Sequence, residues 1–185
     1  MSDPGAALFE SLHLFAIDHF LTADECALLR ELMRAAPAGG ATVARGSTGE
    51  YRLDEAFRRT RRVEVGIEAE REFVTRLESI RDAAAEHFGV KLSETERPQF
   101  LMYREGDFFM RHADRDRAGT NRRAVSIIVF LNHDYTGGEL KFFGEDAAIA
   151  VQPDEGQLIA FRSDTPHEVT SVTSGERFTV VSWFF

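Results

Sequence analysis

Three side chains in the second half of the sequence have the types and the spacing of a metal-binding site. His112 and Asp114 are separated by one residue, and His167 opens the segment that follows Asp164-Thr165-Pro166. Residues two apart in an extended chain point the same way, with Cα atoms roughly 6–7 Å apart, so an imidazole and a short carboxylate can lean onto one ion. His167 would supply the third ligand from elsewhere in the chain. We therefore predict a metal site at His112, Asp114 and His167.

Two histidines and one carboxylate on one face of an octahedron leave three positions open, which is the arrangement of non-haem iron(II) oxygenases. His-x-Asp alone is a weak signal, and the alternative is that Asp114 and Asp116 are simply acids of a loop at 111–123. Asp116 lies roughly 13 Å along an extended chain from His112, too far to share the ion unless the chain turns. The other histidines are interpreted as surface or packing residues: His13, His19, His87 and His133.

A single arginine after the last predicted ligand could hold an acidic co-substrate. Arg177 lies ten residues after His167, across the turn signal Ser174-Gly175. If that turn is tight, Arg177 falls opposite Val172, roughly 16 Å of strand from His167. A five-carbon diacid fits this span, with its keto-acid end on the metal and its far carboxylate paired with Arg177. The alternative for Arg177 is a surface cation on an edge strand.

Composition limits the kinds of partner. The 185 residues are 43% hydrophobic and include 16 Phe, enough for one domain with a sizeable core. A net charge of −9 disfavours nucleic acid or an anionic membrane as the main partner, since both attract basic surfaces. One cysteine, Cys26, excludes an intrachain disulfide. With no signal peptide or membrane span apparent, we expect a soluble cytoplasmic protein; its oligomeric state is left open.

The elements that must position these residues fall into two regions, which we treat as one domain with helical support at 1–97 and a catalytic core at 98–185. Thr22 to Glu25 form a capping-box pattern that opens a helix ending before Pro37, and a second helix is predicted from Ala69 to Phe88. Short strands separated by turn signals predict a mainly β core, either a sandwich or a jelly roll. These strands are Gln99–Arg104, Phe108–His112, Arg123–Leu131, Glu139–Phe143, Ala148–Val151, Gln157–Phe161, His167–Val172 and Arg177–Phe184.

The second half resembles the 2-oxoglutarate/iron(II) dioxygenases, in particular their prolyl 4-hydroxylase-like branch, from Gln99 to Phe185. The motifs that carry this resemblance are, in order, Tyr103-x-x-Gly106, His112-x-Asp114, Phe130-Leu131-Asn132, Gly137-Gly138-Glu139-Leu140, Pro166-His167-Glu168-Val169, Gly175-x-Arg177 and Trp183. The resemblance implies a double-stranded β-helix that requires Fe(II), 2-oxoglutarate and O2, with ascorbate as a candidate reductant. It also implies hydroxylation of an unactivated C–H bond, with succinate and CO2 as co-products.

Two positions depart from the branch. Some relatives have tyrosine where this chain has Phe130, so the hydroxyl that helps bind the far carboxylate is missing. Tyr103, and Thr179 on the same side of its strand as Arg177, are our candidates to assist Arg177. Many prolyl hydroxylases also have a tyrosine near Phe109. These changes keep the cofactor prediction but weaken any transfer of the substrate.

Three functions stay open at this point. The first is hydroxylation of a protein or peptide side chain, with proline as the leading target. The second is hydroxylation of a free amino acid or another small metabolite. The third, from a different class, is a cupin-like metal-binding protein without oxygenase activity. Tyr103 and Arg177 favour an oxygenase over the third function.

The segment from Gly39 to Arg62 is predicted to be a mobile loop that leads into a short strand near Arg62–Val65. It contains Gly46, Gly49 and a cluster of arginines. We expect it to be a lid beside the metal, because oxygenase chemistry requires water to be kept out. The alternative is a solvated run of charge, and a second wall is expected at 115–123. The candidate substrate-facing residues are Arg58, Arg59 and Arg62.

Overall fold

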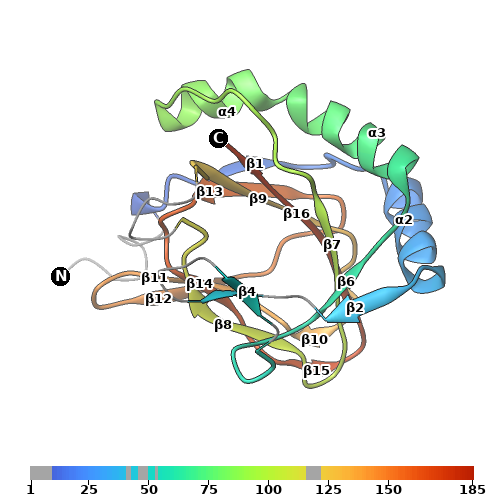
Figure 1. The fold of residues 1–185 in the computed structure, drawn as a ribbon. Helices are drawn as coiled ribbons and strands as arrows, with labels where there is room; N and C mark the ends of the chain where they lie inside the picture. The colour runs from blue at the N-terminus through green and yellow to red at the C-terminus, as the bar shows by residue number, and fades with distance from the viewer. Residues whose placement is uncertain (1–9, 41–42, 46–49, 53, 116–121) are drawn as a thin grey trace.

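The computed structural model describes residues 10–40, 43–45, 50–52, 54–115 and 122–185. Two antiparallel sheets face each other, and the helices pack on the outer face of the larger sheet (Figure 1). This arrangement confirms the predicted mainly β, jelly-roll fold with N-terminal supporting helices.

The larger sheet has seven strands and forms one wall of the core. Its inner strand β9 (Val125–Phe130) is buried along its whole length, because the helices cover one face of the sheet and the second sheet covers the other. A strand covered on both faces is largely apolar, as the sequence VSIIVF shows, with Ser126 as its one polar residue. The strand order is β1 (Phe15–Ile17), β13 (Leu158–Arg162), β9, β16 (Arg177–Phe184), β7 (Gln99–Tyr103), β6 (Arg61–Val63) and β2 (Ala38–Gly40).

The smaller sheet has five strands and carries two of the predicted ligands. In β11 (Leu140–Phe143), buried and half-buried residues alternate, as expected of a sheet with one face on the core. The strand order is β12 (Ala148–Val151), β11, β14 (His167–Val169), β8 (Phe108–His112) and β5 (Arg58–Arg59). Two further pairs lie outside both sheets: β10 (Thr136–Gly137) with β15 (Val172–Ser174), and β3 (Val43–Arg45) with β4 (Glu50–Arg52).

The first helix begins where the sequence predicts. Helix α2 (Ala23–Ala35) has a complete capping box, in which the Thr22 side chain accepts from the Glu25 N–H and the Glu25 carboxylate accepts from the Thr22 N–H. The predicted second helix is wrong as one element, because it is two: α3 (Ile67–Glu78) and α4 (Arg81–Phe88). The break coincides with Ser79, whose hydroxyl donates to the Arg76 carbonyl oxygen and competes with the helical pattern.

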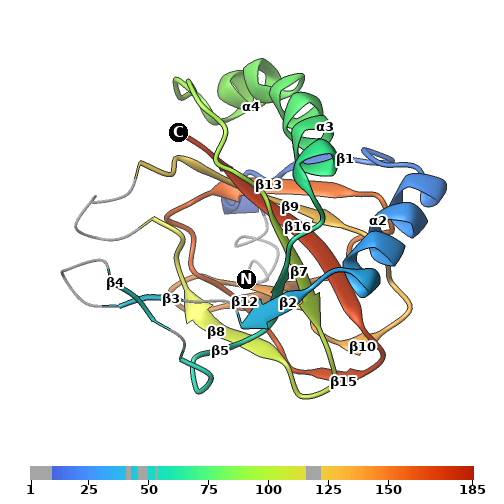
Figure 2. The same ribbon diagram turned by 45° about the vertical axis from the view of Figure 1, so that its right-hand side comes forward.

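The segment from Gly39 to Arg62 is not the loop that the sequence predicts. Many of its described residues form strands: β2 and β6 lie at the edge of the larger sheet, β5 lies at the edge of the smaller sheet, and β3 and β4 pair with each other (Figure 2). Short edge strands of this kind are held by main-chain hydrogen bonds to a neighbour and need no apolar alternation of their own. Gly46 and Gly49, on which the mobile lid depends, lie outside the described residues.

None of the helices in the described part of the chain is long and apolar enough to span a membrane.

Gly156 allows the turn before β13 to approach the segment that precedes α2. Its φ is +78°, and a Cβ there would lie 2.1 Å from the Leu21 carbonyl oxygen. Gly89 has a similar φ of +64° but faces open space. We expect Gly89→Ala to cost about 1–2 kcal/mol of unfolding free energy through backbone strain alone, and Gly156→Ala to cost clearly more because main chain must also move. Chemical denaturation measures both, and equal losses would contradict this account.

Candidate metal centre

Strands β8 and β14 place the two predicted histidines opposite each other. His112 is the Cα partner of His167, while Phe109 is the partner of Val169. Between these pairs, two residues of β8, Met110 and Arg111, lie opposite one residue of β14, Glu168, which is a β-bulge. The extra residue changes the alternation along β8, so that Phe109 and His112 can share a face. The imidazole rings of His112 and His167 lie 4.3 Å apart between centroids.

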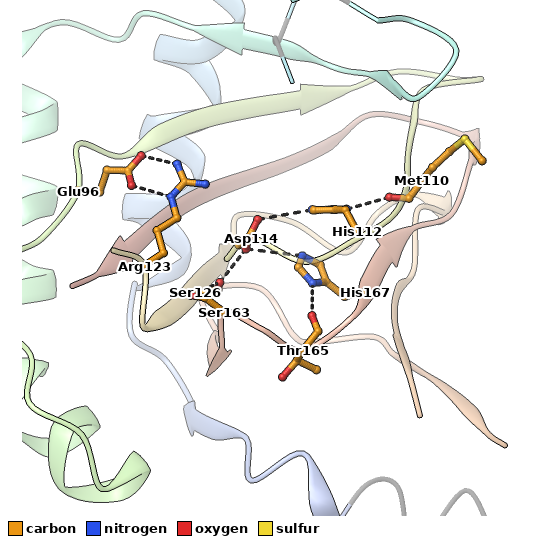
Figure 3. A network of polar contacts seen from close by, with 9 residues as sticks. All are labelled: Glu96, Met110, His112, Asp114, Arg123, Ser126, Ser163, Thr165 and His167. Atoms are coloured by element: carbon orange, nitrogen blue, oxygen red, sulfur yellow. Dashed lines mark hydrogen bonds and ion pairs between the residues drawn. The ribbon is translucent and has the colours of Figure 1, made fainter. Parts of the chain in front are cut away.

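Asp114 follows β8 and turns its carboxylate toward both histidines. Its Oδ1 lies 3.5 Å from Nε2 of His112, and its Oδ2 lies 3.7 Å from Nε2 of His167 (Figure 3). One ligand atom from each of the three residues lies within 4.8 Å of the others, and no other group of three His, Cys, Asp or Glu does so among the residues that the structure describes. The structure thus brings together the three residues that the sequence predicts.

Hydrogen bonds on the far side of each ring fix which nitrogen is free. Nδ1 of His112 lies 2.8 Å from the Met110 carbonyl oxygen, and Nδ1 of His167 lies 2.9 Å from that of Thr165. A carbonyl oxygen only accepts, so each Nδ1 carries the hydrogen and each Nε2 keeps a lone pair. Both lone pairs face the same carboxylate. Two imidazole nitrogens and a carboxylate oxygen in this arrangement fit a divalent metal of the iron type.

Asp114 is held from the opposite sheet. The Ser126 hydroxyl on β9 donates to Oδ2 of Asp114 at 2.7 Å, and lies 2.9 Å from the Ser163 hydroxyl. Because the single hydrogen of Ser126 is used on the carboxylate, the Ser163 hydroxyl must donate to Ser126. The N–H of Arg115 also donates to the Ser163 carbonyl oxygen at 2.8 Å. The smaller sheet therefore supplies the histidines, and the larger sheet orients the acid.

Electrostatics keep Asp114 and His167 in the state that a metal requires. Burial on its own raises the pKa of Asp114, but His167, His112 and the Ser126 hydroxyl lower that pKa well below its usual range. Burial, together with neighbouring His112, lowers the pKa of His167 to about 4. At neutral pH the acid is therefore charged and His167 is neutral, and both can donate electrons to a cation.

Aromatic rings enclose the histidines. The Phe109 ring stacks on His112 with centroids 3.6 Å apart and planes 19° apart. Phe161 meets His167 edge-on at 4.8 Å, and Phe142, which packs against Phe161 at 5.0 Å, lies 6.3 Å from His167. His167 is only 4% exposed. These rings restrict water around the ligands, as oxidative chemistry requires.

Arg177 opens β16 as a fully buried cation. It is 1% exposed, and its Nη1 donates to the Thr179 hydroxyl at 3.3 Å. Its Nε and Nη2 atoms are buried and have no hydrogen-bond partner within the described part of the chain. The guanidinium lies 5.0 Å from the Tyr103 ring centroid and 5.3 Å from that of Phe130. A buried guanidinium with free donors fits the far carboxylate of 2-oxoglutarate.

The predicted hairpin that would pair Arg177 with Val172 is wrong. Strand β15 pairs with β10, whereas β16 pairs with β7 and β9, and the Cα partner of Arg177 is Tyr103. Val172 is nevertheless close, because a Cβ on Gly138 would lie 3.0 Å from Val172 Cγ2 and from Arg177 Cδ. The packing at Gly138 brings the two side chains together, and the turn at Ser174-Gly175 does not.

The three candidate substrate arginines have different surroundings. Arg58 on β5 is 7% exposed, and its guanidinium lies 4.5 Å from the centroid of the Phe109 ring that stacks on His112. Arg59 is exposed beside Phe108, and Arg62 pairs with Glu64 at 3.6 Å. Only Arg58 is thus placed near the metal ligands. Asp116 and most of the expected second wall, at 116–121, lie outside the described residues.

The other histidines for which we expected no metal role lie away from the cluster. His87 lies 2.8 Å from the His13 carbonyl oxygen, and His133 is exposed. Sequence reasoning missed Ser126, Ser163 and the stacking role of Phe109. A serine in an apolar strand, such as Ser126 between Val125 and Ile127, is the one signal that could have identified a buried hydroxyl.

Comparison with known proteins agrees with the metal-binding cluster and the fold described above. Residues 98–185 match the 2OG-Fe(II) oxygenase superfamily. The crystal structure of a Pseudomonas putida prolyl-4-hydroxylase is 30% identical, with 97% of each chain covered and a TM-score of 0.74. A Trichoplax adhaerens prolyl hydroxylase, solved with a hypoxia inducible factor peptide, shares the fold at 19% identity, with 97% of this chain and 86% of that chain covered and a TM-score of 0.77.

A PKHD-type hydroxylase of Acaryochloris marina is 41% identical over 86 residues, which are 45% of this chain. The match spans 39% of that relative's length. The likeness to the Pseudomonas putida structure covers nearly all of both chains. The chain belongs to the 2OG-Fe(II) oxygenase superfamily, and this membership implies Fe(II), 2-oxoglutarate and O2.

Removal of either predicted histidine ligand should abolish metal retention. His112→Ala and His167→Ala each delete one of three donors, so we expect the affinity for Fe(II) or Mn(II) to fall more than about a hundredfold. This loss exceeds the one typical of a change at a residue that only holds a ligand in place. Equilibrium dialysis with metal analysis measures this affinity. His133→Ala is the matched control and should bind as the wild type does. Full metal binding by His167→Ala would contradict the assignment.

Ser126→Ala should weaken metal binding without removing a ligand. The carboxylate of Asp114 would lose the hydroxyl that orients it. Loss of a residue that hydrogen-bonds to a metal ligand costs about 10-fold to 100-fold in metal affinity. Ser174→Ala, at an exposed position on β15, should leave the affinity unchanged. The same dialysis measurement compares the two variants. An unchanged affinity in Ser126→Ala would show that Asp114 needs no help from β9.

Proposed function

We propose that this chain is an Fe(II)- and 2-oxoglutarate-dependent dioxygenase that hydroxylates an unactivated C–H bond of a protein or peptide side chain, with proline as the leading target. The overall reaction consumes the C–H compound, 2-oxoglutarate and O2, and forms the alcohol, succinate and CO2. The observation that carries the proposal is the cluster of His112, Asp114 and His167 in a fold that also buries Arg177. A metal-binding protein without a co-substrate would not need that arginine.

Each residue has a defined task in this proposal. His112, Asp114 and His167 hold the iron, and Ser126 orients the acid. Iron and 2-oxoglutarate, when bound, supply the oxidising chemistry that activates O2. Arg177 binds the far carboxylate through its free N–H groups, and Thr179, which accepts from Nη1, orients the guanidinium. Tyr103 and Phe130 flank the guanidinium, so a charge pair formed there is shielded from water and strengthened.

A peptide substrate is favoured by the proteins that this chain resembles. The Pseudomonas putida structure is named a prolyl-4-hydroxylase, and the Trichoplax adhaerens enzyme was solved with a peptide fragment. Mass spectrometry of candidate peptides and free amino acids for one added oxygen, coupled to succinate release, tests the proposal. Oxygen added to a free amino acid but to no peptide would replace the peptide assignment by the small-metabolite alternative. No succinate release with any substrate, or without one, would overturn the function itself.

Arg177→Ala should weaken the binding of 2-oxoglutarate and leave the binding of the metal unchanged. A charge-assisted pair in a dry site contributes roughly 1.5–3 kcal/mol, so we expect the apparent affinity to fall at least about tenfold. The KM for 2-oxoglutarate measures the loss, and dialysis should show that metal binding persists. Arg162→Ala is the control, because Arg162 is half-exposed beside Asp164. An unchanged KM in Arg177→Ala would require another anchor.

A further inference from the structure

A polar cavity lies beside strands β5 and β6, on the side of the molecule where the two sheets have their edges. It has a volume of about 300 Å³ and is lined by three arginines, Arg58, Arg59 and Arg61, and by two acids, Glu55 and Asp107. The whole protein has a net charge of −9, so this concentration of arginine runs against the general charge. The cavity therefore differs from an ordinary patch of this acidic surface.

Glu55 and Asp107 compensate only part of the positive charge of the three arginines that line the cavity. Asp107 is buried, its carboxylate accepts the N–H of Arg104 at 2.9 Å, and it lies 4.0 Å from Nη1 of Arg61. That Nη1 atom is buried and makes no hydrogen bond to any residue that the structure describes. Glu55 is exposed, so its charge is largely screened by solvent. Three arginines against two acids leave one net positive charge, and Arg61 keeps a free donor.

Arg58 connects this cavity to the metal centre. Arg58 lines the cavity, and its guanidinium lies 4.5 Å from the centroid of the Phe109 ring, which stacks on His112. Burial lowers the pKa of Arg58, and this effect is opposed by nearby Tyr103 and Asp114. The cavity is therefore one aromatic ring away from a metal ligand. A molecule that occupied both the cavity and the metal site would have to pass this ring.

We propose that this cavity is a subsite for a carboxylate of the substrate, so that the enzyme prefers substrates with an acidic group near the hydroxylated carbon. Guanidinium groups match a carboxylate in geometry, and one net positive charge matches one carboxylate. A phosphate carries up to two charges and would be less well compensated. This inference rests on the proposed function. The carboxylate can come from an Asp or Glu side chain of a peptide or from a small acid.

A randomised peptide library with a fixed central proline tests the subsite. The full chain, with Fe(II) and 2-oxoglutarate and without O2, is used to retain peptides that are then sequenced. We expect Asp and Glu to be enriched at one flanking position, and a purified Glu peptide to bind at least about fivefold more tightly than its Gln twin. No acidic enrichment, which includes no retained peptide at all, overturns the proposal for peptides.

Two variants and a control locate the preference. Arg61→Gln, at a partly exposed position, should remove the preference for Glu over Gln, and Arg58→Gln should do the same. Arg104→Gln, at an exposed arginine that pairs with Glu176, should keep it. A preference that survives in both Arg61→Gln and Arg58→Gln would overturn the subsite.

A small-acid arm and a cofactor assay separate the remaining outcomes. N-acetylglutamate that displaces the Glu peptide from the wild type but not from Arg61→Gln supports the subsite with a small acid as a second source. N-acetylglutamate without effect supports a peptide carboxylate. Succinate formation without any substrate is measured in parallel for every variant. If succinate forms but Glu and Gln peptides bind equally, the subsite fails alone; if no succinate forms with or without substrate, the proposed function fails.

Discussion

The register between β8 and β14 is the constraint on which the rest of the site depends. His112 stands opposite His167 only because β8 contains one residue more than β14 between the two paired positions. A regular ladder would leave Phe109 and His112 on opposite faces of the sheet. With the bulge, the ring that shields the site and the nitrogen that faces the metal position lie together. Neither residue could be moved by one place without losing the stack or the cluster.

The site joins the two sheets. Its histidines come from the smaller sheet, whereas the hydroxyl that orients Asp114 and the buried cation Arg177 come from β9 and β16 of the larger sheet. The helices take no direct part, but they bury the outer face of the larger sheet through residues such as Phe73 and Leu77. Their contribution is to keep the central strands rigid, so that a carboxylate and two imidazoles stay within reach of one ion.

The sequence allowed the cluster of His112, Asp114 and His167 to be predicted, because short-range spacing and a recognisable order of motifs carry that information. It also allowed most core strands to be placed, since β8, β12 and β16 have the predicted bounds. Strands β2 and β5 could not be predicted, because they form by pairing with strands that lie farther along the chain. For the same reason, the burial of Arg58 follows from its pairing with β8 and not from its own neighbours.

The attachment of Asp114 to the larger sheet also has a mechanical meaning. An ion held by Asp114 and by both histidines would fix the carboxylate that accepts from Ser126, and so would reinforce the contact between the two sheets. Release of the ion would free that carboxylate, and unfolding would scatter the three ligands, so unfolding and metal release become linked. Chelation would loosen the rim of the sandwich before its centre, where β9, β13 and β16 are paired over long stretches. Metal supply in the cell would thereby set how long the chain survives proteases as well as how fast it works.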